Sequence, residues 1–351
     1  MGVKNLYKLI NQIAPNSITE KNIKEFSGKC IVLDASMIIY QYVIAIRGSG
    51  SDLQNTEGQL TSHILGVLSK TFLLLGNDII PIFVFDGNPP ELKKETLKSR
   101  KEFKKRNLEK LEATEDKDDQ IKYFKRSFSI TQKQIQEVKD ILSLFGVPVI
   151  ESSTEADPLC ANIVSKGLAY AVSSEDMDLL AFGCPKLIRS LSSKKKAFEI
   201  DLKKALLDMK LTQDQFIDLC ILLGCDYCET IPKIGPKRAY EKIKEYGSIK
   251  NFLENDEKVK SGYYKIPINY QENYSNAANF FKNPPLEKNI TKSQLKMGKP
   301  KYNQIKEIMI DIYDFKLNKV NQYLNKIKAF YNKSTNNPSK QIKKYIVSEV
   351  I

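Results

Sequence analysis

Short runs of apolar, β-branched residues alternate with longer amphipathic stretches up to Asp226. The runs predict strands and the stretches predict helices, and this alternation is typical of a mostly parallel sheet covered by helices. We therefore expect an α/β fold with a central, mostly parallel twisted sheet flanked by helices. The expected strands are residues 30–33, 80–85, 147–150, 168–172 and 187–191, and the expected helices include residues 61–75, 132–145 and 155–166.

The segment from Pro89 to Ile130 departs from this rhythm because it is strongly charged and poor in large apolar residues. A charge run of this kind is usually the solvated face of a helix. Since this run directly follows the acidic strand end at Asp86, an insertion that grips a substrate is the second interpretation. Its basic residues are Lys93, Lys94, Lys98, Arg100, Lys101, Lys104, Lys105 and Arg106.

Beyond Asp226 the pattern predicts helices and loops rather than further strands. The stretch from Lys333 to Lys340 contains Asn, Ser, Thr and Pro and predicts a flexible tail. The expected organisation is a core of residues 1–228 that includes the insertion at about 89–130, a helical region at 229–332 and a tail at 333–351.

Lys and Arg number 55 against 42 Asp and Glu, which gives a formal charge of +13. Such an excess suits a polyanionic partner such as nucleic acid, although a lysine-rich protein without such a partner would have the same charge. No apolar run approaches the roughly 18–20 residues that cross a bilayer, so no membrane partner is expected. The six cysteines are scattered through apolar segments, which indicates reduced thiols in an intracellular protein.

The chain holds one histidine, His63, so a Ser-His-Asp or Cys-His nucleophile would depend on it alone. Its surroundings predict an amphipathic helix, which favours a structural role. Cys225 and Cys228 have the spacing of half a zinc site, but no second pair stands at ligand spacing, so core packing is the better interpretation.

Acidic residues follow several of the expected strands at the point where each strand ends. The carboxyl ends of parallel strands line one edge of an open sheet, where ligands bind. Carboxylates crowded there repel one another unless cations neutralise them, and Mg²⁺ prefers such oxygen ligands. The residues are Asp34, Asp86, Glu155, Asp157, Asp176 and Asp178, and Asp226 follows an apolar helix.

Each of these residues also has a structural explanation. Asp34 and Asp86 could cap helices or form turns, and Thr154 with Asp157 fits a capping box. Their recurrence at successive strand ends favours metal binding. Two Mg²⁺ ions about 4 Å apart can clamp the attacking and leaving oxygens of a phosphoryl displacement and generate hydroxide without a histidine.

Several motifs stand in a specific order and spacing along the chain. They are Val32-Leu33-Asp34-Ala35-Ser36-Met37 with Tyr40, Val84-Phe85-Asp86-Gly87 with Pro89-Pro90, Ser174-Glu175-Asp176-Met177-Asp178, and Leu222-Leu223-Gly224-Cys225-Asp226-Tyr227-Cys228. The chain resembles the flap endonuclease family in these motifs, from the first residue to about residue 330. The block Ser36–Arg47 favours this family over its longer repair-nuclease relatives.

The resemblance implies a 5′-nuclease (PIN-like) core with a helical gateway at about residues 89–130. It implies Mg²⁺-dependent hydrolysis of DNA phosphodiesters at single-strand/duplex junctions with a 5′ flap, in replication and repair. The alternatives are a 5′–3′ double-strand exonuclease of the same superfamily and a catalytically weak protein that binds branched DNA. The implied metal ligands are Asp34, Asp86, Glu155, Asp157, Asp176, Asp178 and Asp226, for two Mg²⁺ ions that Mn²⁺ can replace.

The resemblance also implies catalytic and DNA-binding residues. Lys93 and Arg100 correspond to a basic pair that contacts the scissile phosphate, and Asp178 is a catalytic carboxylate. Asp157 stands where the family usually has Glu, one methylene longer. Tyr40 matches an aromatic residue that stacks on a base, although a half-buried helix tyrosine is the plainer interpretation. The implied DNA-binding residues are Gly2, Tyr40, Arg47, Lys93, Arg100, Gly235, Lys237 and Arg238.

The stretch from Ile231 to Ala239 resembles the family's helix–two-turn–helix motif, with an associated monovalent cation. The free N–H groups of a helix that begins at Pro236 attract phosphate, and Lys237 and Arg238 add charge. Lys233 stands where the family commonly has Gly. We expect a monomer that acts inside the cell at sites of DNA replication, in the nucleus of a eukaryote.

The usual sliding-clamp peptide of the family is not found in the sequence. Its nearest match, Ile327 with Phe330 and Tyr331, lacks the Gln and predicts an amphipathic helix instead.

Overall fold

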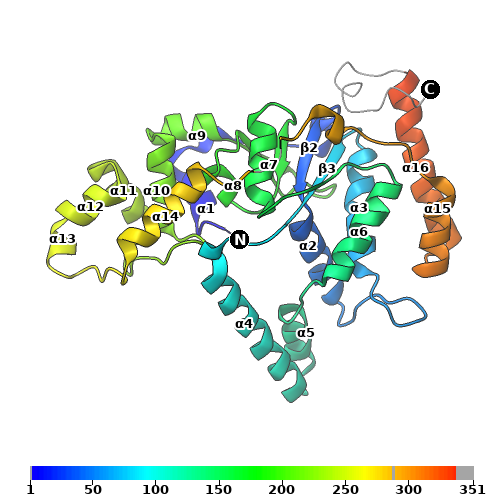
Figure 1. Ribbon diagram of the computed structural model, residues 1–351, viewed down its shortest axis with the longest axis horizontal. Helices are drawn as coiled ribbons and strands as arrows, with labels where there is room; N and C mark the ends of the chain where they lie inside the picture. Colours follow the sequence, from blue (N-terminus) through cyan, green and yellow to red (C-terminus); the bar gives the residue numbers. More distant parts are fainter. Residues whose placement is uncertain (1, 287–288, 337–351) are drawn as a thin grey trace. The chain divides into compact units, whose positions relative to one another are not determined.

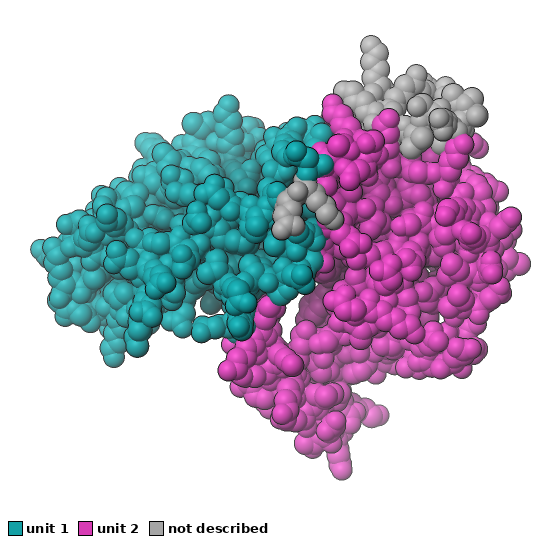
Figure 2. Space-filling view, viewed as in Figure 1, with its two compact units in different colours: residues 1–22, 87–96, 152–289 teal, residues 23–86, 97–151, 290–351 magenta. Residues whose placement is uncertain are grey.

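The structure is a computed structural model that describes residues 2–286 and 289–336. The chain divides into two compact units (Figure 2). Unit 1 contains residues 1–22, 87–96 and 152–289, and unit 2 contains residues 23–86, 97–151 and 290–351. Both units are assembled from separate segments, whereas the domains expected from the sequence are successive ranges. In the described part of the chain, no helix combines the length and the apolar character needed to cross a membrane.

Unit 2 contains three parallel strands, β2 (Cys30–Asp34), β3 (Ile80–Phe85) and β4 (Val149–Glu151). Asp34 pairs with Val84 and Phe85 pairs with Glu151, so the three strands end at the same edge. Every residue of β2 and β3 is buried, which explains their continuous apolar sequences.

Helices of unit 2 pack around α3 (Ser62–Leu75), which contacts α2 (Ala35–Arg47), α6 (Gln132–Leu144) and α16 (Leu317–Asn336). The Phe72 ring stacks on Tyr323 at a centroid distance of 4.6 Å and meets Phe145 edge-on at 5.1 Å. These aromatic contacts join helices that are far apart in the sequence. The unit also contains the 3-10 turns η2 (Ile23–Phe26) and η4 (Lys292–Leu295), the helix α15 (Tyr302–Glu307) and the π-helix η5 (Ile308–Ile312).

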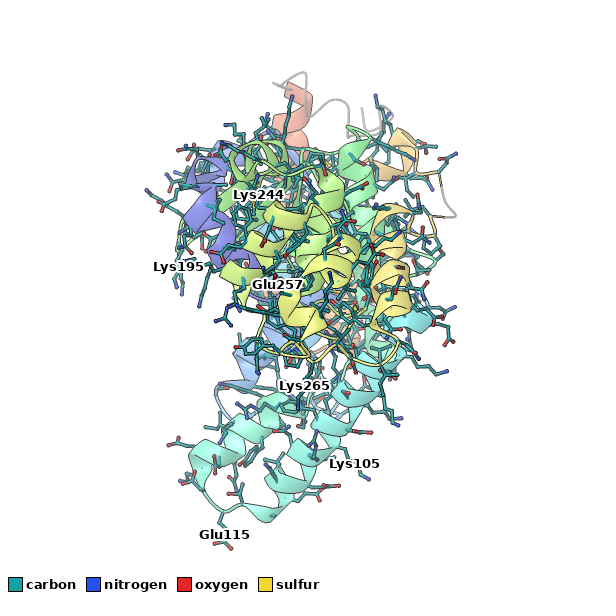
Figure 3. The ribbon with its side chains drawn as sticks, turned by 90° about the vertical axis from the view of Figure 1, so that its left-hand side faces the viewer. Lys105, Glu115, Lys195, Lys244, Glu257 and Lys265 are labelled. Atoms are coloured by element: carbon teal, nitrogen blue, oxygen red, sulfur yellow. The ribbon has the colours of Figure 1, made fainter. Side chains whose placement is uncertain are left out.

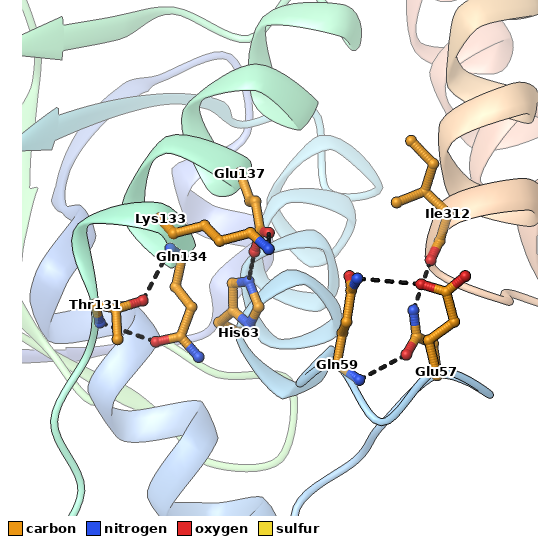
Figure 4. Close-up of polar contacts among 9 residues, drawn as sticks. Glu57, Gln59, His63, Thr131, Lys133, Gln134, Glu137 and Ile312 are labelled. Carbon is orange, nitrogen blue, oxygen red and sulfur yellow. Dashed lines mark hydrogen bonds and ion pairs between the residues drawn. The ribbon is translucent and has the colours of Figure 1, made fainter.

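His63 lies in α3, is 1% exposed, and contacts Glu137 of α6 at 2.8 Å through Nε2 (Figure 4). Burial lowers the pKa of His63, and the hydrogen bond to Glu137 opposes this shift. Thr131 and Gln134 close a capping box at the start of α6. The helix and the structural role expected for His63 agree with this geometry.

The charged insertion forms two helices, α4 (Lys94–Ala113) and α5 (Lys117–Arg126), after the short turn η3 (Glu91–Lys93) (Figure 1). Asn107 is the buried residue of α4, and α5 has none. Asp116 caps α5 through the Asp119 N–H at 2.8 Å. The insertion is helical. It is also largely solvated because its apolar residues are few, as the charge run predicts.

Unit 1 contains strands in the order β1 (Ile18–Lys21), β7 (Ala197–Asp201), β6 (Lys186–Arg189) and β5 (Ala171–Ser173). The β5–β6 pair is parallel, and the β6–β7 and β1–β7 pairs are antiparallel. Its helices are α1 (Leu6–Ile13), η1 (Pro15–Ser17), α7 (Ala156–Ser165), α8 (Asp178–Ala181), α9 (Leu202–Met209), α10 (Gln213–Leu223), α11 (Pro236–Tyr246), α12 (Ile249–Asn255), α13 (Glu257–Lys260) and α14 (Tyr270–Lys282).

Several expected boundaries are wrong. Residues 168–170 lie outside β5, and β4 begins after Pro148, which cannot donate a ladder hydrogen bond. Helix α7 has Glu155 as its N-cap, so the capping box expected from Thr154 and Asp157 is not formed.

Helix α16 continues to Asn336, which makes the first residues of the expected tail helical. The rest of that tail, residues 337–351, lies outside the described residues. Ile327, Phe330 and Tyr331 are buried on α16, so the nearest match to a clamp peptide is part of an amphipathic helix, as expected.

Candidate active site

Two acidic residues of the site follow strand β5. Asp178 is the first residue of α8, and its N–H donates to Asp176 Oδ1 at 3.0 Å. The Asp176 N–H donates to Ser174 Oγ at 3.0 Å, so the turn after β5 is held by its own side chains. Asp176 and Asp178 are buried, which is unusual for carboxylates without a compensating charge.

The start of the chain lies against this turn. The Val3 N–H donates to Asp178 Oδ1 at 2.5 Å. Gly2 has φ +70°, and a Cβ at this position would clash with both carboxylates, reaching 2.5 Å from Asp178 Oδ1. Only a glycine therefore allows the backbone to approach the acidic turn so closely.

Glu155 and Asp157 stand at the start of α7, where the partial positive charge of the helix favours acidic groups. Glu155 accepts a hydrogen bond of 2.5 Å from the Tyr227 hydroxyl. Burial raises the pKa of Tyr227, and Glu155 raises it further, so this hydroxyl stays protonated and donates.

Lys93, at the end of η3, extends its ammonium among these acidic groups. Its Nζ forms ion pairs with Glu155 Oε1 and with Asp226 Oδ2, the latter at 3.4 Å. Burial alone would lower the pKa of Lys93, but Glu155, Asp226 and Asp157 raise it above its ordinary value. The ammonium is therefore charged at neutral pH.

Asp226 lies in the turn after α10, and two backbone contacts fix this turn. Gly224, with φ +102°, accepts a hydrogen bond from the Lys4 N–H at 3.1 Å. Thr96, in the first turn of α4, donates through its hydroxyl to the Asp226 carbonyl at 2.8 Å. The turn is thus tied to the start of the chain and to the start of the charged insertion.

The electrostatics show that the acidic side chains of unit 1 interact. Burial raises the pKa of Asp176, and Asp226 raises it further. Burial raises the pKa of Asp178 more strongly, with Asp176 and Asp226 adding to the shift, while the Val3 N–H and Lys93 oppose it. Mutual repulsion of this kind is relieved when positive charge enters the cluster.

In unit 2, Asp34 and Asp86 lie at the ends of the adjacent parallel strands β2 and β3. Asp34 caps α2 by accepting from the Met37 N–H at 3.1 Å, and Asp86 is exposed. The capping role that the sequence suggests for Asp34 is therefore present.

The expected DNA-binding residues of unit 2 lie on helices. Tyr40 is 39% exposed on α2, and its ring lies 6.0 Å from that of Phe128. Arg100 is half-buried on α4. Arg47, at the end of α2, is buried instead of facing solvent.

The Arg47 guanidinium makes several contacts within unit 2. It forms two hydrogen bonds with Asp52, at 2.9 and 2.7 Å, and donates to the Phe124 carbonyl at 2.9 Å. Its Cζ lies 4.1 Å from the Phe124 ring centroid and 4.9 Å from that of Phe128. These contacts connect the end of α2 to the end of α5.

The residues expected in the helix–two-turn–helix lie at the start of α11 in unit 1. Gly235 is the N-cap without a side-chain cap, Pro236 is the first helical residue, and Lys237 and Arg238 are exposed. Lys233 adopts φ +69°, a conformation that favours Gly.

Cys225 and Cys228 face each other in an isolated β-bridge at the turn that carries Asp226. Both are free thiols, and burial raises the pKa of Cys228 to about 12. The packing role expected from the sequence stays a prediction.

The donor set fits a hard divalent cation, because its ligands are carboxylate oxygens and the Lys93 ammonium already lies among them. Within the residues that the structure describes, no group of three or more His, Cys, Asp or Glu side chains is arranged to hold a metal ion as it stands. The Lys93 ammonium lies between the Glu155 and Asp226 carboxylates and forms an ion pair with each of them.

Three contributors to the site were missed from the sequence. Tyr227 lies inside a matching motif, next to Asp226, and only its hydrogen bond to Glu155 reveals its role. The Val3 N–H is a backbone group and has no residue-type signal at all. Thr96 is one polar residue in a charged helix, and only the fold shows its contact.

Comparison with known proteins identifies two regions of this chain. Residues 1–107 match the family model of the XPG N-terminal domain, and residues 146–226 match that of the XPG I-region. The chain is 39% identical over 358 residues to flap endonuclease 1-A of Oryza sativa subsp. japonica, covering 99% of this chain and 92% of that protein. It is also 39% identical to flap endonuclease 1 of Plasmodium knowlesi, but spans only 58% of that protein's length.

Solved structures share the fold. The flap endonuclease-1 from Methanococcus jannaschii matches with a TM-score of 0.69 and 30% identity, over 90% of this chain and 97% of that one. The catalytic core of Rad2 in complex with a DNA substrate matches with a TM-score of 0.72 and 24% identity, over 93% of this chain and all of that one. The second match supports the α/β fold alone.

Proposed function

The chain belongs to the flap endonuclease family, and we propose that it hydrolyses DNA phosphodiesters with Mg²⁺ at junctions that carry a 5′ flap, with 5′–3′ exonuclease activity as well. The observation that supports this proposal is the buried acidic cluster of unit 1 with the Lys93 ammonium paired to two of its members. A cluster of this composition attracts divalent cations and holds them next to a phosphate.

The proposed metal-binding residues of unit 1 are Glu155, Asp157, Asp176, Asp178 and Asp226. We assign Asp34 and Asp86 of unit 2 to the same set, since they stand at the carboxyl ends of parallel strands. Two Mg²⁺ ions, when bound, lower the pKa of water and stabilise the charge on the attacking and leaving oxygens. Mn²⁺ has similar ligand preferences and is expected to replace Mg²⁺.

Hydrogen bonds from other residues of the chain orient the carboxylates of the site. The Val3 N–H and the Asp178 N–H each hold one carboxylate oxygen, and the Tyr227 hydroxyl holds Glu155. These hydrogen bonds fix the orientation of the carboxylates before the substrate arrives. A preorganised site of this kind avoids reorganisation during the reaction.

Lys93 and Arg100 supply positive charge near the scissile phosphate. Lys93 is charged because Glu155 and Asp226 stabilise its ammonium. When a phosphate enters, the ammonium can exchange one carboxylate partner for a phosphate oxygen. Arg100 follows on the same insertion, about two helical turns farther along α4.

DNA binding is proposed for Gly2, Tyr40, Gly235, Lys237 and Arg238. The uncapped start of α11 offers backbone N–H groups to a phosphate. Arg47 was expected to bind DNA as well, but its guanidinium is engaged with Asp52 and Phe124. We therefore assign it the role of holding α5 against α2.

The proposed partner is branched DNA, bound by a monomer at sites of replication, in the nucleus of a eukaryotic cell. A monovalent cation is proposed at the helix–two-turn–helix. A sliding clamp stays open as a partner, although the usual clamp peptide is not found and its nearest match, Ile327 with Phe330 and Tyr331, is buried in α16.

The test compares the unaltered protein with Asp178→Asn, which keeps the size of the side chain and the acceptor for the Val3 N–H. Cleavage of a labelled 5′ flap should fall by about 10²-fold or more, as for loss of other transition-state electrostatic groups. Flap binding should be kept, since the change removes negative charge near phosphate. The matched control is Asp208→Asn, an exposed carboxylate on α9.

Three outcomes would contradict the proposal. Equal cleavage by Asp178→Asn would refute the site. Cleavage of a blunt recessed duplex in preference to the flap would favour the exonuclease. Flap binding without cleavage by the unaltered protein would favour a branched-DNA-binding protein.

A further inference from the structure

A lysine occupies a strained position in the turn that precedes α11. Lys233 has φ +69°, in the left-handed region that side chains other than Gly, Asn and Asp rarely adopt. The Arg238 guanidinium donates to the Lys233 carbonyl at 2.8 Å, which helps to fix the turn. Because this backbone conformation is unfavourable for lysine, the contacts of the Lys233 side chain must offset its cost.

The Lys233 side chain lies on an aromatic ring from another part of unit 1. Its Nζ is 4.1 Å from the ring centroid of Tyr263 and donates to the Tyr263 carbonyl at 3.4 Å. Lys258 Nζ lies 5.8 Å from the centroid of the same ring. Two ammonium groups therefore gather at one tyrosine.

The Tyr263 ring is exposed, but its position is fixed. It is 47% exposed and meets the ring of Tyr264 edge-on at 5.3 Å. Tyr264 is 2% exposed, packs on Phe252 at 6.0 Å, and donates its N–H to the Lys258 carbonyl. Tyr263 thus presents an exposed ring, supported by Tyr264, on the loop between α13 and α14. Figure 3 shows this loop, with Lys265 labelled on it.

Stability alone does not explain this arrangement. An exposed cation–π contact is weak, and at most comparable with the strain of left-handed backbone at a lysine. The arrangement does hold an ammonium in one place beside the basic start of α11, where Lys237 and Arg238 are also exposed. A fixed group of exposed cations next to an aromatic face is complementary to a nucleic-acid backbone.

We propose that Lys233, Lys258 and Tyr263 form a binding surface for the backbone of duplex DNA, extending the basic start of α11. The Lys233 ammonium contacts a phosphate, and the Tyr263 ring positions that ammonium and packs against the adjacent sugar. The inference rests on the proposed function, because it takes branched DNA to be the partner. The inference adds the loop between α13 and α14 to the elements that bind DNA.

The test is Lys233→Gly, which removes the ammonium and at the same time relieves the strained turn. Binding of a labelled 5′-flap duplex is measured by fluorescence anisotropy in EDTA from about 50 to 200 mM salt. The slope of log affinity against log salt should become shallower by about 1, and affinity at the lowest salt should fall about threefold to fourfold. The melting temperature should stay equal or rise.

Matched variants separate the roles of charge and ring. Lys233→Arg should keep the salt slope, and Lys195→Ala, an exposed lysine in the β6–β7 loop, should leave affinity and slope unchanged. Tyr263→Leu should weaken binding, whereas Tyr263→Phe should preserve it, because the ring face and not the hydroxyl holds the ammonium.

An unchanged salt slope in Lys233→Gly would overturn the inference. If the melting temperature also fell, the contact between Lys233 and Tyr263 would serve only to stabilise the fold. Equal losses in Lys195→Ala would also overturn it, because any surface lysine would then have the same effect. Since binding is measured in EDTA, this result is independent of cleavage, and a failure of the proposed function would appear in the flap assay of the unaltered protein.

Discussion

At the residue scale, Lys93 reduces the electrostatic repulsion between the carboxylates of unit 1. Its ammonium pairs with Glu155 and Asp226, and both residues raise the pKa of Lys93. The same ammonium is close to where we propose that a phosphate binds. One side chain therefore stabilises the free site and contributes charge to the occupied one.

Lys93→Ala should lower the rate of flap cleavage at saturating DNA by about 10²- to 10³-fold, as for loss of other electrostatic groups in an active site. Flap affinity should change little, since the lost cation faces carboxylates as well as phosphate. Single-turnover kinetics measure this rate. Lys94→Ala, at an exposed neighbouring lysine, is the control and should cleave normally. A cleavage rate equal to that of the unaltered protein would remove Lys93 from the mechanism.

His63 makes a second residue-scale prediction, which concerns stability. Burial lowers the pKa of His63 below its ordinary value of about 6.5, so the unfolded chain takes up a proton at higher pH than the folded protein. The free energy of unfolding should therefore fall as the pH drops below about 6.5. This loss should stop below the pKa of the folded state.

Denaturant unfolding of the unaltered protein and of His63→Gln, at several pH values, isolates this contribution. The difference between the two should vary with pH below about 6.5 and be constant above it. A difference that is constant throughout would show that folding does not change the pKa of His63.

At the scale of elements, Arg47 joins α2 to α5. Its guanidinium pairs with the buried Asp52 carboxylate and lies against the Phe124 ring. Helix α5 has no buried residue of its own, so this contact is a main constraint on its position. The contacts of Arg47 with the Phe124 carbonyl and ring therefore help to hold the insertion against α2.

Arg47→Met should destabilise unit 2 by about 3 kcal/mol, because it leaves Asp52 buried without its partner. Hydrogen exchange in α5 should increase. The double variant Arg47→Met with Asp52→Leu should recover most of the lost stability, since neither charge then remains. If the double variant is as unstable as the single one, packing rather than charge holds α5.

The elements that the sequence predicts well are those with a single strong pattern. Strand β3 has the expected bounds, and β2 differs only by including Asp34, because continuous apolar runs mark buried parallel strands. The strands β1 and β7 were missed. Their sequences, ITEK and AFEID, are short and mix polar with apolar residues, as expected for antiparallel strands that are partly exposed.

At the scale of the whole molecule, the site could be predicted only in part. Six of the seven carboxylates follow a rule about strand ends, so their residue types and positions indicated them, whereas Asp226 follows the helix α10. The hydrogen bonds that orient Asp178 and Glu155 come from Val3 and Tyr227, which are distant in sequence. Such contacts, like the division into discontinuous units, depend on long-range packing that local patterns do not contain.

We propose that the acidic residues hold the divalent ions that allow flap cleavage. The most direct test is a Mg²⁺ titration of single-turnover flap cleavage for the unaltered protein, Asp178→Asn and Asp34→Asn, with EDTA as the control. We predict no product in EDTA, and for both variants a lower maximal rate and a higher Mg²⁺ requirement. Cleavage in EDTA, or an Asp34→Asn titration identical to that of the unaltered protein, would contradict the account.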